Sequence, residues 1–158
     1  MNIDAKNMNV HDHNGVTYLT FPSFEAFPFA RHAFSTRIGG VSENEFTSMN
    51  LSFGRGDSDE NVRENYRRLC AAVGFEPESL VASAQDHHTF IRTVTANERG
   101  LGIWRERDMQ SVDGLVTNEP GVTLVTYYAD CVPLYFLDPG RRVVGLAHAG
   151  WRGTVGRI

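Results

Sequence analysis

Two residues with reactive side chains, Cys131 and His148, stand at the outer ends of a predicted β-hairpin. Apolar runs cover residues 132–137 and 143–147, and the turn sequence Asp-Pro-Gly separates them. If the turn is centred on the Pro-Gly step, residues whose numbers sum to 279 face each other, as Cys131 and His148 do. Directly opposed residues have Cβ atoms roughly 4.5–5.5 Å apart. The pattern therefore predicts a thiol beside an imidazole, although a wider loop would shift the register.

A further residue of metal-ligand type, His87 or His88, lies in the segment Gln-Asp-His-His before the hairpin. Two imidazoles and a thiolate suit zinc and leave a fourth position for water or substrate, and the same set suits copper. Two metal-free alternatives remain open: Cys131 as a nucleophile with His148 as its base, or a buried cysteine near two hydrogen-bonded histidines. Asp130 is expected to orient a histidine or a backbone amide.

The sequence Ala-Gly-Trp-Arg-Gly-Thr after His148 predicts a strand that passes through glycines into a helix. Free N–H groups at a helix N-terminus, here near Gly150 and Gly153, attract anions. Arg152 adds a guanidinium group that suits phosphate or carboxylate. Arg37, in a glycine-containing turn, is either a second anion contact or a surface arginine.

The elements that must position these residues are mostly short strands. Alternation and turn residues predict strands, besides the two of the hairpin, over residues 16–21, 29–36, 81–84, 90–94, 114–117 and 122–128. One amphipathic helix is predicted over residues 61–73, followed by Gly74, and residues 38–59 read as a long ordered loop. Neighbouring strand pairs predict an α+β fold with a mixed, largely antiparallel sheet and flanking helices.

Length and composition limit the class of protein. A chain of 158 residues suits one domain with a sizeable core, expected over residues 1–158, and the polar segment 1–14 is expected to be a mobile start or a turn. A net charge of -4 does not favour nucleic acid or a membrane surface as a partner. No membrane helix or signal peptide is predicted. Cys70, expected in the core, and Cys131 indicate reduced thiols and a cytoplasmic location.

Several short motifs occur in an order known from one family. They are Phe34-Ser-Thr-Arg-Ile-Gly-Gly-Val-Ser42, Ser48-Met-Asn-Leu51, Asp57 with Asn61-Val62 and Glu64-Asn65, Gln85-x-His87, Asp113-Gly-Leu-Val-Thr117, Ala129-Asp-Cys-Val-Pro133 and His148-Ala-Gly-Trp-Arg-Gly-Thr154. With these motifs the chain resembles the laccase-domain family, first called polyphenol oxidases and now regarded as purine nucleoside phosphorylases. The resemblance covers residues 34–158.

The resemblance implies a ligand set and a chemistry. It implies that His87, Cys131 and His148 bind the metal, and that His88 is a competing ligand. The metal of the family is usually zinc, whereas copper is implied for an oxidase. The implied reactions are phosphorolysis of adenosine, inosine, guanosine or methylthioadenosine, and deamination of adenosine. The implied fold is an α/β sandwich with a mixed sheet.

The remaining expectations concern substrate contacts and alternatives. Arg37, Asn50 and Arg152 are the predicted contacts to nucleoside and phosphate, and Asp130 is the predicted proton shuttle. Members of the family continue beyond the Trp-Arg-Gly-Thr motif, so the chain is expected to lack the C-terminal part of the family's domain. The alternatives are a copper-dependent polyphenol oxidoreductase, a metal-free Cys-His hydrolase or deamidase, and a non-catalytic binding module. The oligomeric state stays open.

Overall fold

The structure is a computed structural model that describes residues 7–158. The chain divides into two compact units, Met1–Pro77 and Glu78–Ile158. The expectation of one domain over residues 1–158 concerns the association of these units and stays a prediction. Part of the expected mobile start, residues 1–6, lies outside the described residues.

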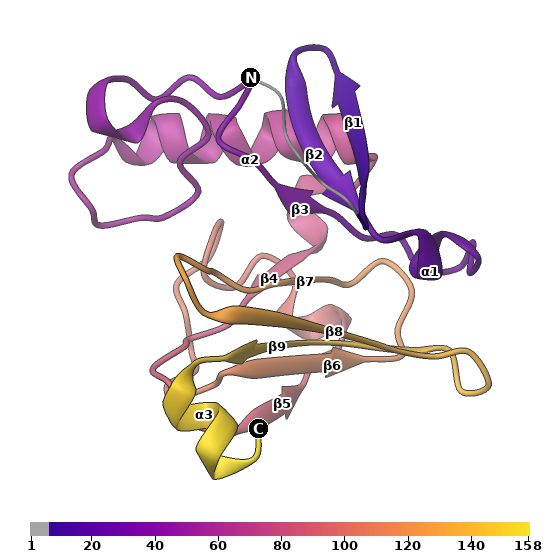
Figure 1. Cartoon of the computed structure of the whole chain (residues 1–158). Coiled ribbons are helices and arrows are strands. Elements are labelled where there is room, and N and C mark those ends of the chain that lie inside the picture. Colours follow the sequence, from indigo (N-terminus) through magenta and orange to yellow (C-terminus); the bar gives the residue numbers. More distant parts are fainter. Residues whose placement is uncertain (1–6) are drawn as a thin grey trace. The chain divides into compact units, whose positions relative to one another are not determined.

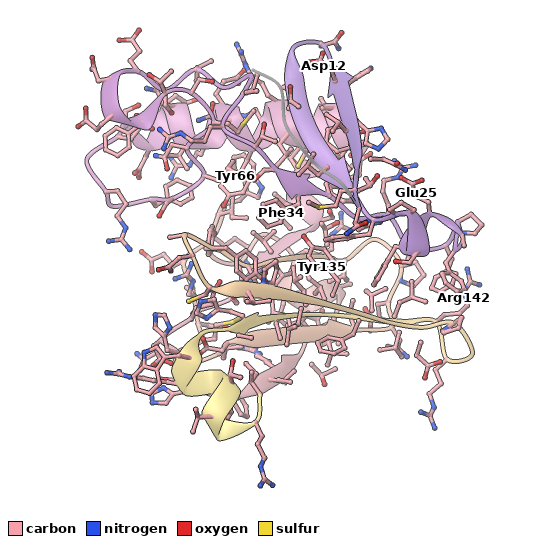
Figure 2. The ribbon with its side chains drawn as sticks, in the orientation of Figure 1. Asp12, Glu25, Phe34, Tyr66, Tyr135 and Arg142 are labelled. Carbon is pink, nitrogen blue, oxygen red and sulfur yellow. The ribbon has the colours of Figure 1, made fainter. Side chains whose placement is uncertain are left out.

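The first unit holds a three-stranded antiparallel sheet in the order β1 (Asn9–His13), β2 (Val16–Thr20) and β3 (Phe34–Ser35). The turn between β1 and β2 is Asn14-Gly15, and both residues have positive φ angles, 53° and 79°, as a tight hairpin turn favours. Asp12 lies near the tip of this hairpin (Figure 2). Helix α2 (Asp59–Val73) packs against β1 and β2, and the short α1 (Pro22–Glu25) follows β2 (Figure 1).

Helix α2 confirms the predicted amphipathic helix and begins two residues earlier, at Asp59. The Ser58 side chain accepts a hydrogen bond from the Asn61 N–H at 3.1 Å, which caps the N-terminus. Gly74 ends the helix in the left-handed conformation, with φ 82°. The buried face carries residues at helical spacing: Val62, Asn65, Tyr66, Cys70 and Val73. Cys70 is 2% exposed, which confirms its place in the core.

The long loop before α2 is held by side chains rather than by regular structure. It contains one 3-10 turn, η1 (Asn44–Phe46). The buried amide of Asn65 accepts from the Val41 N–H at 2.8 Å and donates to Ser42 Oγ and to the Asn50 carbonyl, each at 2.8 Å. Asp57 in turn accepts from Ser42 Oγ at 2.6 Å and from Asn50 Nδ2 at 2.9 Å. These motif residues therefore keep the loop ordered.

The second unit contains two sheets. Strands β4 (Leu80–Ala82) and β7 (Thr123–Val125) pair in parallel. The larger sheet has the order β5-β6-β9-β8, in which β5 and β6 are parallel and the other pairs antiparallel. Its strands and the short helical elements of this unit are β5 (Ile91–Thr93), β6 (Gly114–Thr117), β8 (Val132–Asp138), β9 (Val143–Ala149), η2 (Pro77–Ser79), η3 (Ala96–Glu98) and α3 (Trp151–Gly156). The α+β class with a mixed sheet is confirmed.

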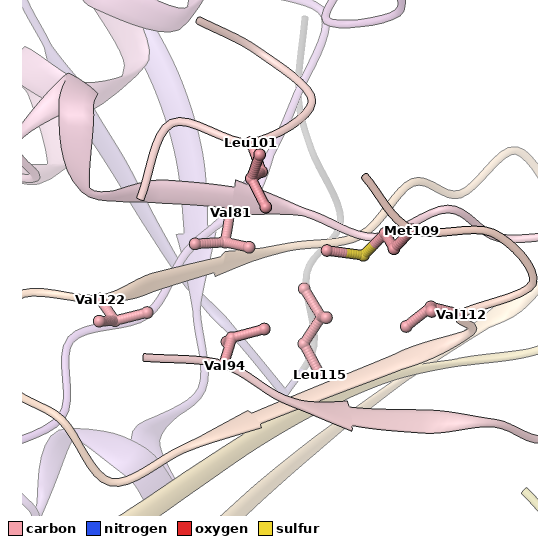
Figure 3. Packing of buried hydrophobic residues seen from close by; sticks show 7 residues of the cluster. All are labelled: Val81, Val94, Leu101, Met109, Val112, Leu115 and Val122. Atoms are coloured by element: carbon pink, nitrogen blue, oxygen red, sulfur yellow. The ribbon is translucent and has the colours of Figure 1, made fainter. Parts of the chain in front are cut away.

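The hydrophobic core of the second unit joins its two sheets. Val81 comes from β4 and Leu115 from β6, and both are at most 1% exposed. The side chains of the cluster point toward one another (Figure 3); they are Val81, Val94, Leu101, Met109, Val112, Leu115 and Val122. Full burial of one such side chain is worth about 1.5–3 kcal/mol. The cluster thus packs β4, β6 and the start of β7 against one another.

The β8–β9 hairpin exists with the predicted strands but in a different register. Asp138 pairs with Val143, and a four-residue loop, with Arg142 at its tip, closes the hairpin (Figure 2). Asp138 Oδ1 accepts from the N–H groups of Gly140 and Arg141, both at 2.9 Å, and so favours this wider loop. His148 therefore pairs with Pro133, and the predicted direct opposition of Cys131 and His148 is wrong.

Two further differences concern the first unit. Strand β1 lies in the segment that we expect, from the sequence, to be a mobile start or a turn. The pattern does not indicate a strand there, because the residues of β1 are mostly polar and exposed and show no apolar face. The strand predicted over residues 29–36 is reduced to Phe34–Ser35. None of the helices within residues 7–158 combines the length and the apolar composition that a bilayer crossing requires.

Candidate metal centre

Three of the predicted site residues come together in the second unit. The ligand atoms offered by His87, Cys131 and His148 all lie within 4.8 Å of one another. His87 lies in the loop after β4, Cys131 directly precedes β8, and His148 belongs to β9. The rings of the two histidines meet edge to face, with centroids 4.8 Å apart. No second group of this kind occurs among residues 7–158.

Gly150 provides the space in which these side chains meet. The hairpin register, continued by one residue, places Gly150 opposite Cys131. A Cβ atom at residue 150 would lie 2.6 Å from His87 Nδ1 and 3.2 Å from Cys131 Sγ. Because φ is -74° there, glycine is needed for its missing side chain and not for its backbone angle.

A buried carboxylate, Asp113, connects two of the three residues. Its Oδ1 is hydrogen-bonded to His148 Nδ1, 2.8 Å away, and accepts a hydrogen bond from the His87 N–H at 2.9 Å. Its Oδ2 accepts from the N–H groups of Asp86 and His88, at 3.2 and 2.9 Å. In the sequence, Asp113 stands out only as part of a motif, and no role is predicted for it. The available signal was an acidic residue directly before a buried strand.

His87, and not His88, belongs to the cluster. The His88 ring is exposed, and its Nδ1 lies 2.6 Å from a carboxylate oxygen of Asp86. The hydroxyl of Ser111 donates to the other oxygen of Asp86, and these contacts, that of Ser111 first, hold the pKa of Asp86 below its usual value. His87 has a left-handed backbone, with φ 70°, which is uncommon for a residue other than glycine.

Gln85 ties the loop of His87 to the segment that leads to Cys131. Its side-chain Nε2 donates to the Tyr127 carbonyl at 2.7 Å, and its Oε1 accepts from the Tyr127 N–H at 2.6 Å. The amide thus pairs with a backbone as a neighbouring strand would. The Tyr128 hydroxyl adds a hydrogen bond to the Ala147 carbonyl in β9, at 3.1 Å. Both contacts connect segments that carry ligand candidates.

The surroundings of Cys131 favour its neutral thiol. Partial burial, followed by the negative charges of Asp130 and Asp113, raises the pKa of the Cys131 thiol. The thiolate is both the nucleophilic form and the form that binds a metal, so this shift does not discriminate between the two hypotheses. Asp130 itself is exposed, and its role as a proton shuttle stays a prediction.

The predicted anion and substrate contacts lie in both units. Arg152 is exposed on α3, with its guanidinium carbon 5.3 Å from the centre of the Trp151 ring. In the first unit, Arg37 donates to the carbonyls of Glu45 and Thr47, at 2.8 to 3.1 Å. Asn50 donates to Asp57 in the loop network. Contacts of these residues with phosphate or nucleoside stay predictions.

Comparisons with known proteins all indicate the same family. A family model described as "Multi-copper polyphenol oxidoreductase laccase" matches residues 31–158. "Purine nucleoside phosphorylase YlmD" of Geobacillus stearothermophilus is 44% identical over 125 residues, which are 78% of this chain and 46% of that protein. "Purine nucleoside phosphorylase" of Deinococcus radiodurans is 42% identical over 127 residues, 80% of this chain and 46% of that protein.

Solved structures agree. "Hypothetical protein YfiH" of Bacillus licheniformis superposes with a TM-score of 0.83 at 32% identity, over 93% of this chain and 54% of that one. YlmD of Geobacillus stearothermophilus gives a TM-score of 0.79 at 38% identity, over 95% and 54%. The chain therefore spans about half the length of these relatives. The matching family model, the ordered motifs and these relatives show that the chain belongs to the laccase-domain family.

Proposed function

We propose that the chain is the metal-binding part of a zinc-dependent purine nucleoside phosphorylase. One observation carries the proposal: His87, Cys131 and His148 bring three ligand atoms within 4.8 Å of one another in a chain 44% identical to a protein named purine nucleoside phosphorylase. The chain spans about half of that relative. Activity is therefore proposed for the protein of which these residues form the site.

The donor set suits zinc. Two imidazoles and one thiolate with an open fourth position are typical of catalytic zinc sites. The missing side chain of Gly150 leaves room between His87 and Cys131 for their ligand atoms to approach a shared ion. When bound, zinc supplies a Lewis acid and lowers the pKa of coordinated water toward about 7.

In phosphorolysis, a phosphate oxygen forms a bond to the ribose anomeric carbon as the bond from that carbon to the purine nitrogen breaks. We assign Arg152 to hold the phosphate, because its exposed guanidinium presents paired donors two residues beyond Gly150. Arg37 is the second proposed phosphate contact, and Asn50 the proposed contact to ribose or base. A guanidinium beside the phosphate offsets its charge as the new bond forms.

The same site is proposed to deaminate adenosine, in which water replaces the amino group and ammonia leaves, and to cleave methylthioadenosine by phosphorolysis. Asp130 is the proposed proton carrier in deamination, since it is exposed directly beside Cys131.

The two cysteines are free thiols, which supports the proposed cytoplasmic location.

A copper-dependent polyphenol oxidoreductase is the second candidate. The description of the matched family model favours it, and two histidines with one cysteine also suit copper. The two candidates differ in the metal that the purified chain retains, and in whether phosphate or oxygen is consumed.

Elemental analysis of the purified 158-residue chain tests the proposal, with His148→Ala and a matched control, His88→Ala. About one zinc per chain is expected, lost in His148→Ala and kept in His88→Ala, because His88 is bound to Asp86 outside the cluster. Phosphate-dependent release of hypoxanthine from inosine is the activity assay. Copper with oxygen uptake would support the second candidate, and a chain without metal at any zinc concentration would overturn the ligand assignment.

A further inference from the structure

The side chain of Asp113 contacts the segments that carry His87 and His148. Its own backbone is fixed from both sides: its N–H donates to the Phe90 carbonyl at 3.0 Å, and its carbonyl accepts from the His148 N–H at 2.7 Å. The residue is 0% exposed. Its carboxylate is therefore held in one place within the second unit.

The Asp86 side chain forms a hydrogen bond with this carboxylate, and four nitrogen atoms contact it. Three are backbone amides of residues 86–88, and the fourth is the ring Nδ1 of His148. Successive amides that point at one anion form a concave binding site. Adopting it requires His87 to keep its left-handed backbone, with φ 70°. The carboxylate thus accounts for a backbone conformation that places the His87 ring beside His148.

The contact with His148 also fixes where its proton resides. A carboxylate that already accepts three N–H groups serves His148 only as an acceptor, so the ring carries its proton on Nδ1. That leaves Nε2 bare and available to a metal. A carboxylate behind a ligating histidine commonly sets ring orientation and tautomer in this way.

We propose that Asp113 is the positioning residue of the metal centre: it holds His148 in the tautomer whose Nε2 is free, and it holds the loop that presents His87. This inference rests on the proposed function. Asp113 is not itself one of the three ligand candidates. Cys131 is positioned independently, through Gln85 and Tyr127.

The first test measures the unaltered chain without metal, so its result does not depend on whether an Asp113 variant folds. A long-range proton–nitrogen correlation spectrum at about pH 8, where a free imidazole is neutral, reports the tautomer of each ring. The His148 signal is identified by its absence in His148→Ala. We expect the proton on Nδ1 and none on Nε2. A proton on Nε2 would overturn the proposal.

The second test is Asp113→Asn, in which an amide NH₂ must face N–H donors in either orientation. Its zinc affinity is expected to fall about 10–100-fold. Asp108→Asn removes an exposed carboxylate of the same unit that pairs with Arg92, and its affinity is expected within about twofold of the unaltered chain. Equal affinity of Asp113→Asn and the unaltered chain would overturn the proposal.

The two tests separate this inference from the proposed function. If the chain binds zinc and Asp113→Asn weakens binding, but the protein of which these residues form the site cleaves no nucleoside, the phosphorylase proposal fails and the role of Asp113 stands. If the unaltered chain binds no zinc, the metal assignment fails, and the His148 tautomer alone decides the role of Asp113. If Asp113→Asn does not fold, the His148 tautomer again decides the role of Asp113.

Discussion

Cys131 and His148 lie two residues out of direct opposition on the β8–β9 hairpin. His148 pairs with Pro133, and the same register places Cys131 opposite Gly150. Because strand side chains alternate between faces, residues 131 and 133 belong to one face, and His148 shares it. Cys131 and His148 are thus diagonal neighbours, which long side chains can bridge. The residue directly opposite the thiol is a glycine, and His87 enters the space that it leaves.

Gly150→Ala should therefore disrupt the metal centre without unfolding the chain. The new Cβ would lie 2.6 Å from His87 Nδ1, closer than side chains tolerate, while the backbone angle suits alanine. We expect zinc affinity to fall at least about tenfold, measured by competition with a chelating dye. Gly140→Ala at the hairpin tip is the control, since its Cβ would meet only Asp138 Oδ1 at 3.4 Å. Unchanged affinity of Gly150→Ala would show that His87 is not confined by this glycine.

Arg152→Ala should separate phosphorolysis from deamination. The proposed phosphate contact disappears, so KM for phosphate should rise about tenfold or more, as loss of a charged hydrogen bond implies, while adenosine deamination persists. Steady-state assays at several phosphate concentrations measure this. Arg157→Ala, an exposed arginine at the end of α3, serves as the control. Equal loss of both reactions in Arg152→Ala would assign Arg152 a structural role.

Asn65→Ala should destabilise the first unit by roughly 3 kcal/mol, because it leaves the Val41 N–H and two or more loop partners without their buried hydrogen bonds. Urea unfolding followed by fluorescence measures the change. Asn61→Ala, on the same helix, removes one side-chain hydrogen bond to Asp57 and should cost about 1 kcal/mol. Similar losses in the two variants would contradict the central role of Asn65.

Asp57 should make stability depend on acid. Hydrogen bonds from Asn50, Ser42 and Asn61 hold the pKa of Asp57 below its ordinary value of 3.8. The carboxylate therefore stabilises the fold above about pH 4, and this contribution is lost as pH falls through the lowered pKa. In Asp57→Asn the deficit in unfolding free energy should be full at pH 7 and shrink below about pH 4.

The control for this pH dependence is Asp59→Asn, two residues along. Asp59 is exposed and makes one contact, 3.7 Å from Arg63, so its removal should change stability by less than about 1 kcal/mol. Urea titrations from pH 7 to about pH 3 compare the three proteins. A deficit in Asp57→Asn that stays constant over this range would mean that the charge of Asp57 does not contribute.

Local patterns were sufficient to predict most of the framework. The apolar runs of β8 and β9, the glycine after α2 and the strand at Gly114–Thr117 each depend on residues close in sequence, and the structure has them at or near the predicted bounds. Strand β1 shows why polar edge strands are missed: its pairing with β2, and not its own composition, makes it a strand.

The site shows a different limit. Its ligand candidates were found by residue type and motif, yet the hairpin register depended on a side chain, Asp138, that accepts two loop amides. Asp113 acts on amides 25 to 27 positions away, and on a ring 35 positions away. Such contacts depend on the complete fold of the unit, so no local pattern in the sequence reveals them.

The distribution of His87, Cys131 and His148 along the chain has a thermodynamic consequence. Residues 87 and 148 lie 61 positions apart, in a loop before β5 and in the strand β9. An ion held by both would act as a reversible cross-link that closes a long loop of the unfolded chain. At a free zinc concentration one hundred times the dissociation constant, it would add about 2.7 kcal/mol to the unfolding free energy. The ligand set would then contribute to stability as well as to catalysis. The melting temperature of the second unit would rise with the concentration of free zinc.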